Sequence, residues 1–165
     1  MPYKVRTEGM EELGAMLRGL GEKAESVASM ALFEGAAVMA DEIKKAAEGI
    51  KTAPFKYAGA GQTRLPSPEE KAAILGVEGK GISKFRKDGD GVNTSIGYAR
   101  AGYAEVAGKT RPIPLIVNSI NSGTSFMQKQ PFMREAVNKG SKKAEKAMRE
   151  KIEAEWEKIT KETNK

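Results

Sequence analysis

The segment from about residue 131 to the end of the chain constrains the fold most, because its apolar residues recur at helical spacing. Lys and Glu fill most of the positions between them. The pattern predicts a long surface helix with one buried face, frayed after Thr160. A coiled-coil arm is the alternative, although too few clean heptads support it. The apolar positions are Met133, Val137, Ala144, Met148, Ile152 and Ile159, with Trp156 alongside.

Two further helices are predicted in the first third of the chain. A short amphipathic helix over residues 9–20 ends at Gly21, and a longer helix follows over residues 22–48. Small residues such as Gly35 would let another element approach the longer helix closely. Its exposed face is predicted at Asp41, Glu42, Lys44 and Lys45. Its apolar face is predicted at Ala28, Leu32, Gly35, Met39, Ile43 and Ala46.

The middle of the chain is rich in turn signals. Residues 52–68 contain several Gly and Pro residues and predict a loop, with a brief helix beginning near Pro68. Residues 82–86 and 92–98 alternate apolar and polar side chains on either side of a Gly-Asp-Gly turn, which predicts a β-hairpin. A short helix should follow Pro114, with Gly123 as its C-terminal cap.

The loop over residues 52–68 has few apolar anchors, so we expect it to be mobile in the free protein. If the protein assembles around DNA, contacts with neighbouring subunits or with the DNA channel would then order the loop. The alternative is an ordinary surface loop that stays mobile everywhere.

Residues 102–110, GYAEVAGKT, are similar to a phosphate-binding loop, which makes nucleotide binding a question. Such a loop has four residues between its first glycine and the Gly-Lys-Thr, whereas this chain has one more, Tyr103 to Ala107. The loop must also lead straight into a helix, but Pro112 and Pro114 favour an extended backbone there. The sequence therefore predicts that Lys109 binds no nucleotide.

The chain has no cysteine and no histidine, which removes thiolate metal sites and the commonest general base. We therefore expect no enzymatic activity and no cofactor. No apolar run approaches the roughly 20 residues that span a bilayer, and the first residues lack the apolar core of a secretory signal. These features predict a single domain over residues 1–165, made in the cytoplasm and without a membrane partner.

The net charge of +6 is distributed unevenly along the chain. Residues 1–50 carry 6 basic and 9 acidic side chains, residues 51–111 carry 11 and 6, and residues 112–165 carry 11 and 7. An acidic first third beside a basic remainder is typical of head-to-tail association, or of a basic surface that faces nucleic acid. Solubility alone would also explain it.

Residues 120–137, INSGTSFMQKQPFMREAV, carry the most specific pattern in the chain: a Gly-Thr-Ser, a polar spacer, and a Pro-Phe-Met-Arg that begins a helix. This pattern resembles the minor tail-component or neck-protein family of long-tailed, lambdoid-like bacteriophages. The residues that carry it are Gly123, Thr124, Ser125, Pro131, Phe132, Met133, Arg134 and Ala136.

The first third of the chain agrees with the resemblance, at residues 9–13 (GMEEL) and 40–44 (ADEIK). Two features depart from it. Asn121-Ser122 stands where the family often has an acidic-aromatic pair, and residues 52–111 match poorly. Apart from the resemblance, Gly123 suits a backbone with positive φ, Pro131 suits a helix start, and Phe132 suits the core.

The resemblance implies an α+β domain with helices packed on a small antiparallel sheet. It also implies a non-enzymatic virion protein that acts in head–tail joining or tail completion, in a ring of identical subunits around the DNA channel. The implied partners are other head–tail junction and tail proteins, and the implied location is the host bacterial cytoplasm and then the virion. Basic residues facing the channel would contact DNA without reading its bases.

A small basic DNA-binding protein is the alternative function. Its DNA-facing residues would be Lys80, Lys84, Arg86 and Lys87 in and beside the predicted hairpin. The chain shows no known DNA-binding motif, and its aromatic content of 6% disfavours stacking on single strands.

Overall fold

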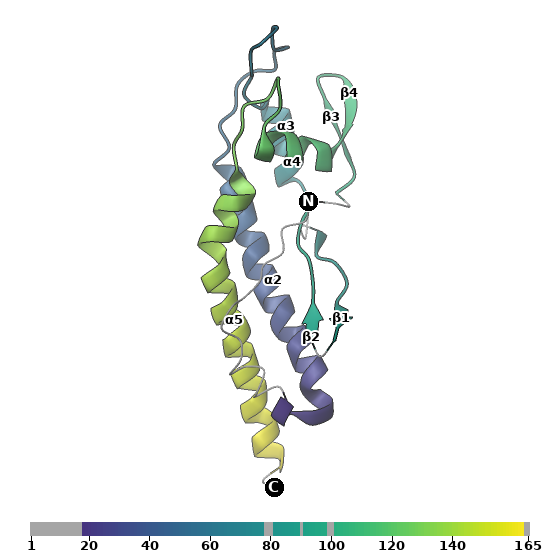
Figure 1. Cartoon of the computed structure of the whole chain (residues 1–165), viewed down its shortest axis with the longest axis vertical. Helices are drawn as coiled ribbons and strands as arrows, with labels where there is room; N and C mark the ends of the chain where they lie inside the picture. Colours follow the sequence, from purple (N-terminus) through teal and green to yellow (C-terminus); the bar gives the residue numbers. More distant parts are fainter. Residues whose placement is uncertain (1–17, 78–80, 90, 99–100, 164–165) are drawn as a thin grey trace.

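The computed structural model describes residues 18–77, 81–89, 91–98 and 101–163. Two long helices, α2 (Ala24–Glu48) and α5 (Phe132–Thr163), lie side by side and run in opposite directions along the molecule (Figure 1). Two short helices, α3 (Pro68–Leu75) and α4 (Ile113–Ser122), and two β-hairpins complete the fold. The predicted α+β class is confirmed. The helix predicted over residues 9–20 falls largely outside the described residues, which include the 3-10 turn η1 (Gly21–Lys23) after it.

Helix α2 has nearly the predicted bounds, but its buried face is displaced from the predicted one. Gly35, Met39 and Ile43 are buried as predicted, whereas Ala28, Leu32 and Ala46 are only partly covered. The buried face follows steps of four residues, and each step turns it by about 40° around the helix axis. Its buried members are Val27, Ala31, Gly35, Ala36, Met39, Glu42, Ile43 and Ala47.

The two long helices approach closely because glycines lie at their contact. A Cβ atom built at Gly35 would come within 2.7 Å of Met148 Cγ on α5. One built at Gly140 on α5 would come within 2.7 Å of Met39 Sδ on α2. The prediction that small residues of the first long helix admit a neighbour is confirmed, and that neighbour is α5.

Glu42 was predicted on the exposed face of α2, and this prediction is wrong. The residue is buried against α5, where Gly140 leaves room for it, and its carboxylate accepts hydrogen bonds from Lys143 at 2.9 Å and Lys45 at 3.3 Å. The Lys143 hydrogen bond lowers the pKa of Glu42 and outweighs the opposing effect of burial.

The buried face of α5 follows the predicted pattern, with Val137, Trp156 and Ile159 only partly covered. The helix continues to Thr163, beyond Thr160 where the sequence predicts fraying. Its C-terminal half encloses a small core with α2, made of Leu20, Val27, Ala31, Met148 and Ile152. A larger core lies at the other end of the molecule, and its fully buried side chains include Ile43, Ile74, Val106, Ile120 and Met127.

Two separate two-stranded antiparallel sheets replace the single small sheet that was predicted. The first hairpin pairs β1 (Arg86–Asp88) with β2 (Gly91–Asn93), so its strands are shorter than predicted. The second pairs β3 (Tyr103–Val106) with β4 (Lys109–Pro112) and was not predicted. Its two-residue turn places Ala107 and Gly108 at positive φ, a role for which alanine gives no sequence signal.

This second hairpin shows whether residues 102–110 have the geometry of a phosphate-binding loop. Residues 102–110 form strand, turn and strand rather than a loop that enters a helix, and Lys109 is exposed on β4. Helix α4 begins only at Ile113, after Pro112 has ended the strand. The geometry of a phosphate-binding loop is therefore missing from residues 102–110, as the spacing predicts.

The loop over residues 52–68 has no regular secondary structure before α3, as predicted, apart from one isolated bridge described below. Ser67 caps α3 by accepting a hydrogen bond from the Glu70 N–H at 3.2 Å, and the Glu70 carboxylate accepts one in return from the Ser67 N–H at 2.8 Å. The loop also has more attachments than its composition suggests, including a backbone hydrogen bond from Ala53 to Pro66. Its mobility in the free protein stays a prediction.

Candidate functional site

The connector between α4 and α5 contains the Gly-Thr-Ser motif and requires its glycine. Gly123 has a φ of 74°, as predicted for a residue that ends a helix. A Cβ atom at this position would also lie 2.9 Å from Lys129 Cβ and 3.2 Å from Lys129 Cα. Gly123 therefore allows the connector to fold back on itself.

Thr124 closes this turn with its side chain. Its hydroxyl oxygen accepts hydrogen bonds from the N–H groups of Met127 at 3.0 Å and Phe126 at 3.3 Å, while its own N–H donates to the Met127 carbonyl. The turn buries Met127 and leaves Ser125 exposed. Thr124 thus acts as a local structural residue.

The Pro-Phe-Met-Arg part of the motif begins α5 and anchors it. Phe132, Met133 and Ala136 are buried, and the Phe132 ring meets Tyr98 edge-on with 6.5 Å between ring centres. Pro131 precedes the first helical residue, and Arg134 is exposed. The prediction that Phe132 holds this helix against the core is confirmed.

Asn121 caps the same helix, a role that the sequence reasoning missed. Its side-chain oxygen accepts a hydrogen bond from the Met133 N–H at 3.1 Å, so the last turn of α4 satisfies a donor in the first turn of α5. The capping residue lies twelve positions before Met133 and not directly before the helix. The sequence offered one signal for it, the departure of Asn121-Ser122 from the acidic-aromatic pair of the family that residues 120–137 resemble.

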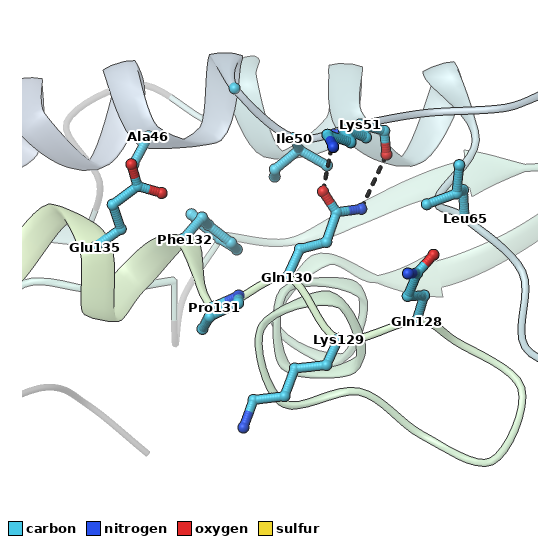
Figure 2. Close-up of a pocket in the computed structure, with 11 residues that line it drawn as sticks. Ala46, Ile50, Lys51, Leu65, Gln128, Lys129, Gln130, Pro131, Phe132 and Glu135 are labelled. Carbon is cyan, nitrogen blue, oxygen red and sulfur yellow. Dashed lines mark hydrogen bonds between the residues drawn. The ribbon is translucent and has the colours of Figure 1, made fainter.

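The connector is joined to the loop over residues 52–68, although the two are far apart in the sequence. The Gln130 amide accepts from the Lys51 N–H at 2.8 Å and donates to the Lys51 carbonyl at 2.9 Å (Figure 2). The Arg64 backbone makes two further hydrogen bonds, to Phe126 and Gln128, in a short parallel bridge. We call residues 51–66 together with 123–134 the loop end of the molecule.

A buried ion pair joins the loop end to α3. The Arg64 guanidinium donates two hydrogen bonds to the Glu70 carboxylate, at 2.6 and 2.7 Å, and it lies 4.6 Å from the centre of the Phe55 ring. Burial raises the pKa of Glu70, but the hydrogen bonds from Arg64 and Ser67 outweigh it, so the pKa lies below its ordinary value. Because both partners are satisfied, the pair serves the structure of the loop end.

An open groove of about 430 Å³ lies on the surface of the loop end. Apolar atoms of Ile50, Leu65 and Phe132 line it, together with Lys51 and Lys129 (Figure 2). Its acidic residue, Glu135, is paired with Lys139 at 2.6 Å. The lining therefore offers shape and positive charge, and it brings together no nucleophile and base.

The predicted DNA-facing residues lie apart from the loop end. Lys84, Arg86 and Lys87 are exposed on or beside the first hairpin, next to α2, whereas Lys80 falls outside the described residues. Lys87 forms an ion pair of 2.6 Å with Glu25 on α2. The hairpin is therefore a basic surface with one of its charges partly compensated.

The described part of the chain has neither a cluster of metal-ligating side chains nor a helix that could span a membrane. No three His, Cys, Asp or Glu side chains are grouped there as metal ligands. Nor does any helix there have the length and apolar character that a membrane crossing requires.

Comparison of the chain with models of protein families, with curated proteins and with solved structures finds no match.

Proposed function

We propose that the protein is a non-enzymatic structural component of the virion of a tailed phage or prophage, acting in head–tail joining or tail completion. In this proposal, identical subunits form a ring around the DNA channel and contact other head–tail junction and tail proteins. Assembly takes place in the host cytoplasm. The proposal derives from the resemblance of residues 120–137 to the neck and minor tail-component family.

The observation that carries the proposal is the use made of the motif residues. Gly123 and Thr124 shape a turn, and Phe132 and Ala136 fill the core. Hydrogen bonds between Gln130 and Lys51 join this segment to residues 51–66. Residues that a ligand or reaction would need are not gathered there. Apart from the exposed Ser125 and Arg134, the motif serves the shape of the protein, which supports a building-block role.

Exposed apolar side chains on separate elements also support assembly. Phe33 on α2 is 55% exposed, and Leu115 on α4 is 57% exposed. A ring requires heterologous contacts, in which one surface of a subunit meets a different surface of its neighbour. Two exposed apolar side chains on different elements, with the uneven charge of the chain, fit such contacts.

Disruption of the gene in a phage or prophage that carries it tests the proposal. Electron micrographs of the lysate should show unattached heads, or tails without normal ends, and the wild-type gene supplied on a plasmid should restore joined particles. Intact virions in the absence of the gene product would contradict the proposal. Portal, capsid and tail-tube genes next to this gene would add independent support.

The alternative function, a small DNA-binding protein that uses residues 80–87, is favoured by the exposure of Lys84, Arg86 and Lys87. The ion pair between Lys87 and Glu25 weighs against it, since that charge is already partly neutralised. Binding that is lost with the hairpin cations, in a protein without any role in particle assembly, would favour this alternative.

A further inference from the structure

The loop end carries a concentration of positive charge. Residues 51–66 and 123–134 contain five cationic side chains and no Asp or Glu. Arg64 is neutralised by Glu70 inside the structure. Lys51, Lys56, Lys129 and Arg134 are exposed, and within the described residues none of them forms an ion pair. Four cations without an ion pair therefore lie in the two segments of the loop end, and two of them, Lys51 and Lys129, line the same groove.

Nearby groups do not cancel this charge. The carbonyl groups at the end of α2 would add negative potential, but Lys71 donates to the Glu48 and Ile50 carbonyls at 2.6 and 3.0 Å. Glu135, which lines the same groove, is paired with Lys139, whereas Glu48, three residues before Lys51, is exposed. The four cations of the loop end are therefore exposed and form no ion pair within the described residues, although the exposed carboxylates of Glu48 and Glu135 reduce the positive field around them.

We propose that the loop end binds duplex DNA through its phosphate backbone, without reading the base sequence. Duplex DNA carries one negative charge per roughly 1.7 Å of its length, so several flexible lysines can each neutralise a phosphate. The tip of the loop, residues 58–63 (AGAGQT), is uncharged and made mostly of small residues, which lets the backbone of a duplex approach. Base readout needs side chains that reach into a groove with fixed geometry, and the four cations lack such support.

Two other partners fit the same surface less well. A single strand needs successive aromatic platforms, but Phe55 is already covered by Arg64 and meets Tyr57 edge-on, with 5.2 Å between ring centres. A stable protein interface needs about 800 Å² per partner with an apolar centre. The tip residues 58–63 are small, so the exposed apolar area of the loop end is mainly that of Tyr57, 73% exposed, and Phe126, 44% exposed. The phosphate backbone of a duplex is the partner that the charge pattern favours.

This inference rests on the proposed function only for the presence of DNA beside the protein. The test measures binding of the full chain to a labelled duplex of about 30 base pairs, by fluorescence anisotropy between about 50 and 200 mM salt. Substitution of Lys51, Lys56 and Lys129 by Gln should weaken binding at least tenfold and reduce the salt slope by about three. A matched triple substitution of Lys84, Arg86 and Lys87 by Gln should change binding less than twofold.

Each other outcome overturns the inference. Equal loss in the two triple variants would show a general effect of net charge, and loss only in the hairpin variant would move the site there. Tighter binding of a single strand, abolished by Tyr57→Ala, would assign the loop end to single strands. Competition by polyglutamate as effective as that of duplex DNA would assign it to an acidic protein. If the Lys51, Lys56 and Lys129 variant binds DNA normally but particle joining fails, this inference is wrong and the proposed function stands. If the variant loses DNA binding but the gene proves dispensable for joined particles, the proposed function is wrong and this inference stands.

Discussion

The loop end and the opposite half of the molecule both carry exposed lysines, but the two regions differ in whether those lysines form ion pairs. In the far half, residues 18–35 with 144–163, lysines lie one helical turn from glutamates, as in the pairs Lys146–Glu150 and Lys151–Glu155. At the loop end, the only described ion pair is the buried one between Arg64 and Glu70, and the remaining cations are exposed alone. The comparison shows that the neighbours of a lysine, rather than its presence, decide whether it is available to a partner.

The two regions also satisfy their backbones differently. In the far half, most of the backbone belongs to the regular helices α2 and α5. At the loop end, the side chains of Thr124 and Gln130 bind backbone groups in place of secondary structure, and Asn121 of the adjoining α4 does the same. Loss of one side chain at the loop end should therefore cost more than an equivalent loss on the surface of the far half. The following predictions test this difference.

The largest effect is expected for Phe132→Ala. The side chain is 3% exposed, and its removal should lower the free energy of unfolding by about 3–5 kcal/mol because it leaves a cavity in the larger core. Phe33→Ala on the exposed side of α2 is the matched control and should change it by less than about 1 kcal/mol. Urea unfolding measures both. Similar midpoints for the two variants would place Phe132 outside the core.

Arg64→Ala should have an effect of similar or slightly smaller size. It leaves the Glu70 carboxylate buried without its partner, which typically costs about 3–5 kcal/mol. Lys146→Ala breaks an exposed pair in the far half and should cost less than about 0.5 kcal/mol. Thermal unfolding followed by circular dichroism compares them. Equal destabilisation by the two substitutions would contradict the comparison between the regions.

Acidification should remove the same ion pair by protonating Glu70. Because its pKa is lower in the folded than in the unfolded protein, its contribution to stability is fully present above pH 4.5 and is lost as the pH falls through the folded-state pKa. Glu42 contributes with the same sign. The Glu70→Gln variant should be less stable at pH 7 and should lose less stability on acidification. An unchanged acid dependence would rule out this role for Glu70.

Gly123→Ala should cost roughly 1–3 kcal/mol. The substitution places a side chain at positive φ and against the Lys129 backbone. Gly21→Ala is the control in the far half: its φ of 58° is also positive, but no atom lies within 4 Å of the added Cβ. It should therefore cost less than Gly123→Ala. If the two costs, measured by chemical denaturation, are equal, the close packing of the connector contributes nothing.

Lys109→Ala should have the smallest effect, within about 0.5 kcal/mol, because the side chain is exposed on β4. Calorimetric titration with ATP should detect no binding to the wild-type protein. Measurable binding that disappears in this variant would revive the phosphate-loop hypothesis and contradict the hairpin geometry.

The helices were predictable because their signals are local. Apolar spacing located α2 and α5, and Pro114 with Gly123 bracketed α4. The second hairpin was not predictable, since its turn uses Ala107 at positive φ, a position for which the usual residues are Asn, Asp or Gly. Glu42 was misplaced because the space that receives it is provided by Gly140, almost a hundred residues later. The sequence predicted a basic surface at the hairpin and not at the loop end, because the cations of the loop end come from two segments, residues 51–66 and 123–134, that are far apart in the chain.

By itself, the sequence determined the class of the fold, the long helices and the turn at Gly123, because helical periodicity and glycine conformation depend on residues near one another in the chain. It also determined that cysteine and histidine chemistry is missing. Only the tertiary structure decided which face of α2 is buried, which charges are paired and which loops meet at the loop end. Those features depend on contacts such as Gln130 with Lys51 and Lys143 with Glu42, whose partners are brought together by the antiparallel packing of α2 and α5.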